Sequence, residues 1–221
     1  CRNCQSPKRT RSALDGYRPV MTRLTVPLPS WSFPMRQLLR DRGLIFIALV
    51  VITALAYWPG LSGGFLFDDY PNIVQQELVH AESISMESMR TAAQAFPHGM
   101  AGRPLATVTF AIDHARWGLD PWGYKLTSLL VHLVNVLLVY GLVGRILSLV
   151  GTPARSGRGA AFAIALLWAI HPLQVSTVLY VVQRMETLSL SFVLMALLCY
   201  LRGRENQITG VRAWPWLLAC L

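Results

Sequence analysis

The chain has 221 residues, of which 53% are hydrophobic and only 14% are charged, and its mean hydropathy is +0.42. Soluble domains carry about a quarter of charged residues, so this composition excludes an ordinary soluble domain and indicates a polytopic membrane protein. The net charge of +9 does not indicate nucleic-acid binding, because the basic residues lie in blocks rather than along a stripe with interleaved aromatic side chains. We therefore expect an all-α fold, a bundle of transmembrane helices.

The first long apolar run predicts a membrane span at residues 43–60. Tyr57 and Trp58 lie at its end, where an interfacial aromatic belt is expected. A cleaved signal peptide is the alternative, because arginines precede the run and Ala54-Leu55-Ala56 resembles a cleavage site. The run is longer than the usual signal core of about 7–15 residues, and further apolar runs follow, which favours a span.

Four more apolar stretches follow, and they predict spans at 122–150, 159–172, 176–201 and 213–221. Arginines gather in the loops between the second and third and between the fourth and fifth of the five spans, as they do in the amino-terminal tail. Basic loops favour the cytoplasmic side. Residues 61–121, which are rich in acids, are then expected outside the cytoplasm. Residues 36–221 are thus predicted to form a transmembrane domain with a helical extracytoplasmic loop.

The ends of the chain predict a piece of a longer protein. The sequence begins with Cys1 rather than Met, and it ends inside an apolar run. Residues 1–35 have no hydrophobic periodicity, and we expect them to be disordered or untranslated. Cys1 and Cys4 offer only two of the four ligands of a structural zinc site, and no second pair follows, so zinc is not expected there.

Two segments of the acidic loop, 82–96 and 103–118, have apolar side chains at helical spacing. Their expected apolar faces are Met86, Met89, Ala93 and Phe96 in the first segment and Leu105, Val108 and Ile112 in the second, where Phe110 and Trp117 widen the apolar side. Each segment is too short to span a bilayer, so both are interpreted as helices on the membrane surface. A small soluble cap is the alternative.

The stretch GGFLFDDYPNIV, residues 63–74, places Asp68 and Asp69 side by side directly after the first span. Adjacent carboxylates repel each other and are costly near a bilayer, so such a pair indicates a function. An ionised Asp can act as a general base, and two together could also hold a divalent metal. The alternative is a helix N-cap, which would explain one aspartate but not both.

Two arginines in or near the expected outer face are candidates for binding a phosphate, because the planar guanidinium matches phosphate oxygens. Arg103 opens the second surface segment, and Arg184 lies early in the fourth span. An ion pair of Arg184 with Glu186 is the structural alternative, although residues two apart do not share a helical face. His171 and Gln174, at the outer end of the third span, either line a donor cavity or belong to a turn.

Polar side chains recur in the second span at positions i, i+3, i+7 and i+10, namely Lys125, Ser128, His132 and Asn135. Lipid offers no hydrogen bonds, so this stripe must face other helices or a wet cavity. Hydrogen bonding between helices is the preferred interpretation.

The order of the motifs FLFDDYPNIV, GRPLATVTF, YKLTSLLVHLVNVLLVYGL and HPLQVSTVLYVVQRMETLSLSFVLMALLCYLRGR resembles the C-type glycosyltransferases. The likeness is greatest to the transmembrane and tetratricopeptide-repeat O-mannosyltransferases and their bacterial relatives, and it covers about residue 40 to residue 221. Ser128 departs from the pattern, where Asn is expected, and no repeats follow. The resemblance is to the amino-terminal part of such a protein.

The resemblance implies a hexosyltransferase of the bacterial inner membrane, acting on its outward face. It would move a sugar from a polyprenyl-phosphate carrier to a hydroxyl, with protein Ser or Thr as the expected acceptor and no certain cofactor. Asp68 would be the base, and Asp69 would orient the acceptor or help hold a divalent metal. Arg103, Arg184, His171 and Gln174 would surround the donor phosphate. A secondary transporter and a non-catalytic membrane module are the alternatives.

Overall fold

The computed structural model describes residues 43–95 and 103–220, all of which belong to one compact unit, residues 32–221. Every regular element in the described ranges is helical, which confirms the all-α expectation. The four longest helices are α2 (Gly43–Tyr57), α5 (Pro121–Leu149), α6 (Ala154–Ala169) and α8 (Arg184–Ile208). The shorter elements are η2 (Trp58–Ser62), η3 (Tyr70–Val74), η4 (Glu77–Val79), α3 (Met86–Ala93), α4 (Pro104–Trp117), α7 (Gln174–Leu179), η5 (Val181–Gln183) and α9 (Trp214–Leu218).

Three helical stretches of the described residues are long and apolar enough to cross a membrane: Gly43–Ser62, Pro121–Leu149 and Val181–Ile208. They correspond to the first, second and fourth expected spans. The third expected span coincides with α6, which has 16 residues, and the last contains α9, which has five. Spanning by these two segments stays a prediction.

The fourth span differs from the expected 176–201 at both ends. Tyr180 has an extended backbone, with φ −91° and ψ 109°, so residues 174–179 form a separate helix rather than the start of the span. At the other end α8 continues to Ile208, seven residues beyond the expected Leu201. Its last turns stay helical because Glu205 ion-pairs with Arg145 of α5 and with Arg202, so the charged end of α8 is still packed against the bundle.

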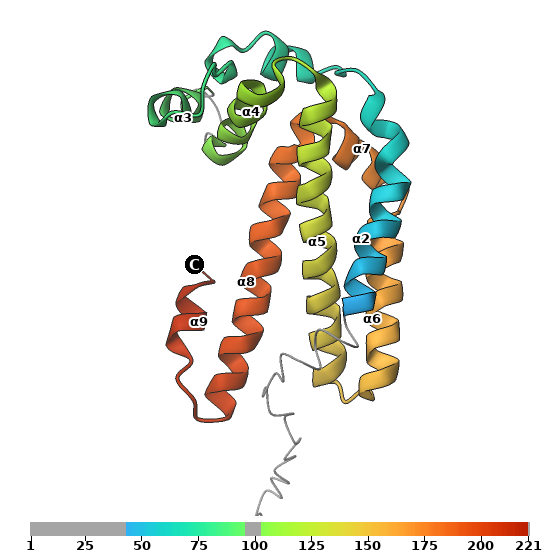
Figure 1. Ribbon diagram of the computed structural model, residues 1–221. Coiled ribbons are helices and arrows are strands. Elements are labelled where there is room, and N and C mark those ends of the chain that lie inside the picture. The colour runs from blue at the N-terminus through green and yellow to red at the C-terminus, as the bar shows by residue number, and fades with distance from the viewer. Residues whose placement is uncertain (1–42, 96–102, 221) are drawn as a thin grey trace, which may run out of the picture. The chain divides into compact units, whose positions relative to one another are not determined.

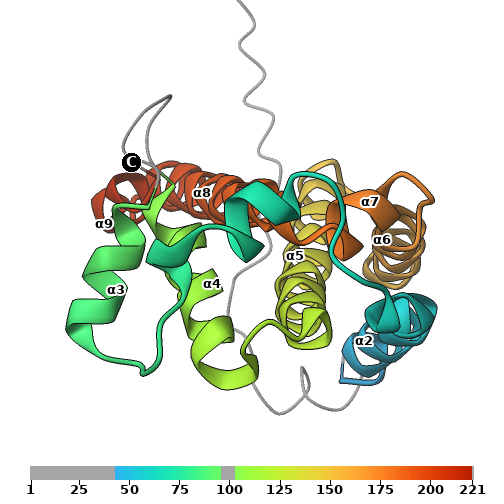
Figure 2. The same ribbon diagram turned by 90° about the horizontal axis from the view of Figure 1, so that it is seen from above.

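The long helices run back and forth, so that successive connections lie at opposite ends of the bundle (Figure 1). The end of α2, the start of α5, the end of α6 and the start of α8 share one end with α3, α4 and α7 (Figures 1 and 2). The link between α5 and α6, next to Arg155 and Arg158, lies at the other end. The expected separation of the acidic loop from this basic loop is therefore present in the fold.

Helices α2, α5 and α6 pack closely because α6 presents alanine at every fourth position. Ala161, Ala165 and Ala169 are fully buried against Leu49 of α2 and Val136 of α5. Small residues let helix backbones approach within a membrane, where the hydrophobic effect does not drive helices together. This packing fixes α2, and with it the point where the Asp68–Asp69 segment begins.

The two expected surface helices exist as α3 and α4, but their buried faces are only partly the expected ones. Phe110 is fully buried as expected, whereas Met86 is 70% exposed and Leu105 is 47% exposed. Phe96 lies outside the described residues. The prediction was wrong for Met86 and Leu105 because α4 packs against α3 on one side and α8 on another through small and polar residues, including Ala106, Thr107, Ala111 and Asp113.

Candidate functional site

The two adjacent aspartates occupy opposite environments. Asp69 is fully buried: its Oδ1 accepts the Val182 N–H at 2.8 Å, and its Oδ2 accepts the Leu66 N–H at 3.0 Å. Burial raises the pKa of Asp69, while these N–H groups and the nearby Lys125 ammonium act in the opposite direction. The side chain of Asp68 is exposed. Asp69 therefore fastens the segment to the start of α8, and Asp68 presents a carboxylate to the surroundings.

The backbone of Asp68 is held on both sides. Its N–H donates to the Tyr180 hydroxyl at 2.8 Å, and its carbonyl accepts a hydrogen bond from the Asn72 side-chain amide at 2.7 Å. Phe67, just before it, has φ +36°, a left-handed conformation that is an outlier for a bulky residue. Such strain persists only where the surroundings impose it, and it concentrates at functional sites. The fold thus fixes the position of Asp68 at a conformational cost.

Residues 63–69, which we call the Asp68 loop, follow a close contact between Gly60 of η2 and Leu179 of α7. A Cβ on Gly60 would lie 2.1 Å from a methyl group of Leu179, so a larger residue in η2 would force the Leu179 side chain of α7 to move. After the loop, Tyr70–Val74 form a single π-helical turn, a geometry that occurs often at functional sites. Contacts to α7, Tyr180 and Val182 together bind the Asp68 loop to a segment more than 100 residues away in sequence.

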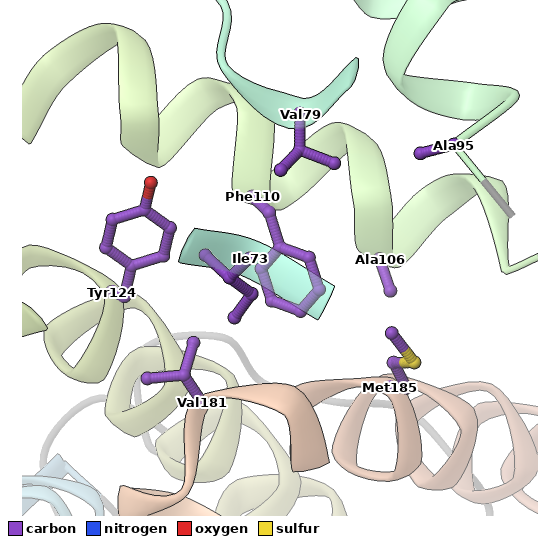
Figure 3. Close-up of a cluster of buried hydrophobic side chains, with 8 residues drawn as sticks. All are labelled: Ile73, Val79, Ala95, Ala106, Phe110, Tyr124, Val181 and Met185. Atoms are coloured by element: carbon purple, nitrogen blue, oxygen red, sulfur yellow. The ribbon is translucent and has the colours of Figure 1, made fainter. Parts of the chain in front are cut away.

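A buried apolar cluster lies beneath the Asp68 loop (Figure 3). Phe65 of the loop packs edge-on against Tyr124, with ring centroids 5.5 Å apart. The cluster draws on six segments of the chain and consists of Ile73, Val79, Ala95, Ala106, Phe110, Tyr124, Val181 and Met185. Because η3, α4, α5 and α8 all contribute, the loop rests on a base that depends on the whole end of the bundle.

Arg184 does not occupy the expected position for a phosphate ligand. It is fully buried and ion-pairs with Asp113 of α4, with Nη1 2.6 Å from Oδ2. It also donates to the Ser128 hydroxyl, the Thr109 hydroxyl and the Tyr124 carbonyl, and it lies over the Phe110 ring. The interpretation of Arg184 as a phosphate ligand is therefore replaced by a structural one. The alternative pairing with Glu186 is not formed either, because Glu186 pairs with Arg103 at 3.0 Å.

Arg103 is the more accessible of the two candidate cations. Its side chain is 51% exposed, and its partner Glu186 is 54% exposed. Exposed ion pairs contribute about 0–1 kcal/mol, so Glu186 does not prevent Arg103 from binding an anion. Arg103 stands at the start of α4, as expected, but no hydrogen bond or ion pair joins it to the Asp68 loop within the described ranges.

Three members of the polar stripe on α5 make the interhelical hydrogen bonds that the sequence predicts. Ser128 accepts from Arg184, His132 Nε2 lies 3.0 Å from the Ala169 carbonyl, and Asn135 donates to the Thr187 carbonyl at 2.8 Å. All three are buried. Lys125, the fourth member, is also buried, but in the part of the chain that the structure describes it makes no hydrogen bond or ion pair.

His171 and Gln174 stand where α6 turns into α7. His171 is exposed, and its Nδ1 accepts the Leu173 N–H at 3.3 Å, a contact within the turn. Gln174 begins α7. Across residues 43–95 and 103–220 no hydrogen bond or ion pair links either side chain to Asp68 or Asp69, so their place in a donor cavity stays a prediction.

A metal site at Asp68 and Asp69 would need further ligands, and the described residues place none beside the pair. Within the described ranges no group of three His, Cys, Asp or Glu side chains is close enough to hold a metal ion. Cys1 and Cys4 lie outside those ranges. The Asp69 oxygens already accept two backbone N–H groups, which leaves the exposed Asp68 as the carboxylate of the pair that is available for chemistry.

Comparison with known proteins finds relatives that support the motif resemblance. The protein O-mannosyl-transferase TMTC2 of Mus musculus is 35% identical over 117 residues, which is 52% of this chain and 13% of the relative. TMTC2 of Xenopus laevis is 37% identical over 117 residues, with the same coverage. Tmtc3 of Drosophila melanogaster is 29% identical over 206 residues, which is 85% of this chain and 22% of the relative.

The chain therefore spans between an eighth and a quarter of the length of these curated relatives. No family model matches it, and no solved structure matches it. The expected resemblance to these O-mannosyltransferases is confirmed.

Proposed function

We propose that the chain forms the catalytic end of a membrane glycosyltransferase that moves a hexose from a polyprenyl-phosphate carrier to a protein hydroxyl. Mannose is the first sugar to test, because the similar proteins are named O-mannosyl-transferases. The placement of the Asp68 loop supports the proposal. It follows directly after a helix that can span a membrane, at a depth where a lipid-borne sugar and a protein segment can both reach it.

In the proposed reaction the acceptor oxygen attacks the anomeric carbon of the sugar and forms a new glycosidic bond. The bond between that carbon and the carrier phosphate breaks, and its electron pair leaves with the phosphate. The hydroxyl proton passes to the Asp68 carboxylate, which acts as general base. Asp69 positions the loop through its two backbone hydrogen bonds, and Arg103 is a candidate for contact with the phosphate.

One observation carries this assignment: Asp68 and Asp69 are neighbours with the same side chain, but Asp69 is buried and Asp68 is exposed. The Asp69 carboxylate has no exposed surface and accepts two N–H groups, while Asp68 is exposed and its backbone is fixed by Tyr180 and Asn72. A capped helix start would use the exposed carboxylate as an acceptor for its own N–H groups, and η3 has no such cap. An exposed carboxylate on a fixed backbone is what general-base catalysis needs.

We further propose that the Asp68 loop faces the outside of the cytoplasmic membrane of a bacterium. The acidic composition of residues 61–121 and the arginines at the other end of the bundle favour this orientation. Cysteine labelling of intact cells tests it, with Glu82→Cys and Ser156→Cys introduced singly after the four native cysteines are replaced. Both positions are exposed and lie at opposite ends of the bundle. Labelling at position 156 but not at position 82 would show that the orientation is opposite to the proposed one.

The experiment for the reaction is sugar transfer in membranes that contain the full-length natural protein. A radiolabelled polyprenyl-phosphate sugar is the donor, and each variant is normalised to its amount. Asp68→Asn is expected to reduce transfer about 10²–10⁴-fold, the usual contribution of a general base. Glu82→Gln, which removes an exposed acid from the same segment, is the matched control and should transfer normally. Normal transfer by Asp68→Asn would refute the assignment.

A further inference from the structure

Lys125, at the outer end of α5, is a buried cation that the reaction described above does not use. Its side chain is only 2% exposed. Within residues 43–95 and 103–220 its ammonium group makes no hydrogen bond and has no carboxylate within 4 Å. Lysines in proteins are almost never this buried unless they are paired. Lys125 is attracted to Asp69 through space but makes no direct contact with it in the described ranges, so its three N–H donors are available to a ligand.

The carboxylates of the site make no ion pair with Lys125 in the described ranges. Asp69 attracts the Lys125 ammonium electrostatically, but the Asp69 oxygens are directed to the N–H groups of Leu66 and Val182. The neighbouring polar residue one turn along α5, Ser128, binds Arg184 instead. Arg184 in turn is neutralised by Asp113. The two buried cations at this end of the bundle therefore differ: Arg184 is ion-paired with Asp113, whereas Lys125 makes no ion pair within the described ranges.

The ammonium lies directly against the first glycine of the Asp68 loop. A Cβ built on Gly63 would stand 2.8 Å from Lys125 Nζ, closer than a methyl group can pack. Gly63 and Gly64 are both exposed and carry no side chain. Because neither glycine carries a side chain, an anion that reaches this part of the loop would meet Nζ only a few residues before Asp68.

We propose that Lys125 binds the phosphate of the lipid-linked sugar donor, with Gly63 leaving the approach open. The proposal rests on the function proposed above and adds the residue that recognises the carrier. A lysine ammonium is a point charge with three donors, suited to phosphate oxygens from more than one direction. In this arrangement the phosphate leaves toward Lys125 while the acceptor proton moves to Asp68.

The test measures carrier binding without turnover. Detergent-solubilised full-length protein is titrated with polyprenyl phosphate, with uncharged polyprenol and with inorganic phosphate. The parent protein should bind polyprenyl phosphate at least about tenfold more tightly than polyprenol, because a hydrogen bond to a charged group discriminates by that much. Lys125→Met, which keeps length and removes charge, should abolish the preference. Lys125→Arg should keep part of it, and Gly63→Ala should weaken it by blocking the approach.

Arg155→Gln removes one exposed positive charge at the other end of the bundle and is the matched control. Lys125→Met with an unchanged preference for polyprenyl phosphate would overturn the proposal, as would a variant that loses thermal stability while its folded fraction still prefers the phosphate. Binding of inorganic phosphate as tightly as of the lipid, lost in Lys125→Met, would overturn the lipid carrier as the ligand. Asp68→Asn should bind the carrier normally, so a failure of the catalytic assignment and a failure of the Lys125 proposal give different results.

Discussion

The Asp68 loop and the buried cluster around Arg184 lie at the same end of the bundle, and each brings an aspartate near a buried cation, Lys125 of α5 and Arg184 of α8. In the Arg184 cluster every charge has a partner: Arg184 is neutralised by Asp113 and donates to Thr109, Tyr124 and Ser128. Among the described residues, neither the exposed carboxylate of Asp68 nor the ammonium of Lys125 forms an ion pair. The contrast separates charges that hold helices together from charges that are available to bind and react.

The largest expected change in stability comes from breaking the Arg184 cluster. Arg184→Met should destabilise the folded protein by about 3–5 kcal/mol, because it leaves the Asp113 carboxylate buried without its partner. Thermal unfolding in detergent, or the yield of folded protein in membranes, measures this loss. The double variant Arg184→Met, Asp113→Leu should recover most of it, since no charge is then left unpaired. A single variant as stable as the parent would contradict the structural role.

A smaller loss is expected at Asp69. Asp69→Ala removes the acceptor of the Leu66 and Val182 N–H groups, which should cost about 1–3 kcal/mol. The loss should be local, because these bonds tie the Asp68 loop to the start of α8 rather than one long helix to another. Hydrogen exchange is the measurement: the N–H groups of Leu66 and Val182 should exchange faster, while those in the middle of α5 keep their protection. Unchanged exchange at Val182 would show that Asp69 does not hold the loop.

The smallest expected change is at Phe67, whose φ of +36° disfavours residues with a Cβ. Phe67→Val should be less stable than Phe67→Gly by about 1–2 kcal/mol, because glycine adopts left-handed conformations without this penalty. Phe67 is 82% exposed, so loss of packing contributes little to the comparison. The two variants are compared by thermal unfolding. Equal melting temperatures would indicate that the loop relaxes and that Asp68 is not rigidly presented.

Sequence reasoning located the elements well because it rests on periodicity and length. The first, second and fourth spans, α3, α4 and the inward polar stripe on α5 all follow from the spacing of apolar and polar residues. Predictions from the sequence were wrong where a contact with a residue distant in sequence determines the environment of a side chain. Arg184 looked accessible near a span terminus, and nothing local to it indicates that Asp113, 71 residues earlier, neutralises it.

The same limit applies within the candidate site. The Asp-Asp pair was visible in the sequence, but the pair does not reveal which aspartate is buried, because this depends on Val182 and Tyr180. Lys125 was recognised only as a member of a stripe. Its position at Gly63 results from the close return of the loop over the start of α5. Such contacts require the tertiary arrangement and carry no periodic signal.

The measurement that tests the account most directly is the transfer rate per folded molecule for Asp68→Asn and Arg184→Met in the same membranes. The account predicts that Asp68→Asn is present at the parental level but transfers about 10²–10⁴-fold less. Arg184→Met should be depleted, while each molecule that remains folded transfers sugar at a rate close to that of the parent. The reverse result, a folded Arg184→Met that transfers no sugar beside an active Asp68→Asn, would contradict the division between structural and reactive charges.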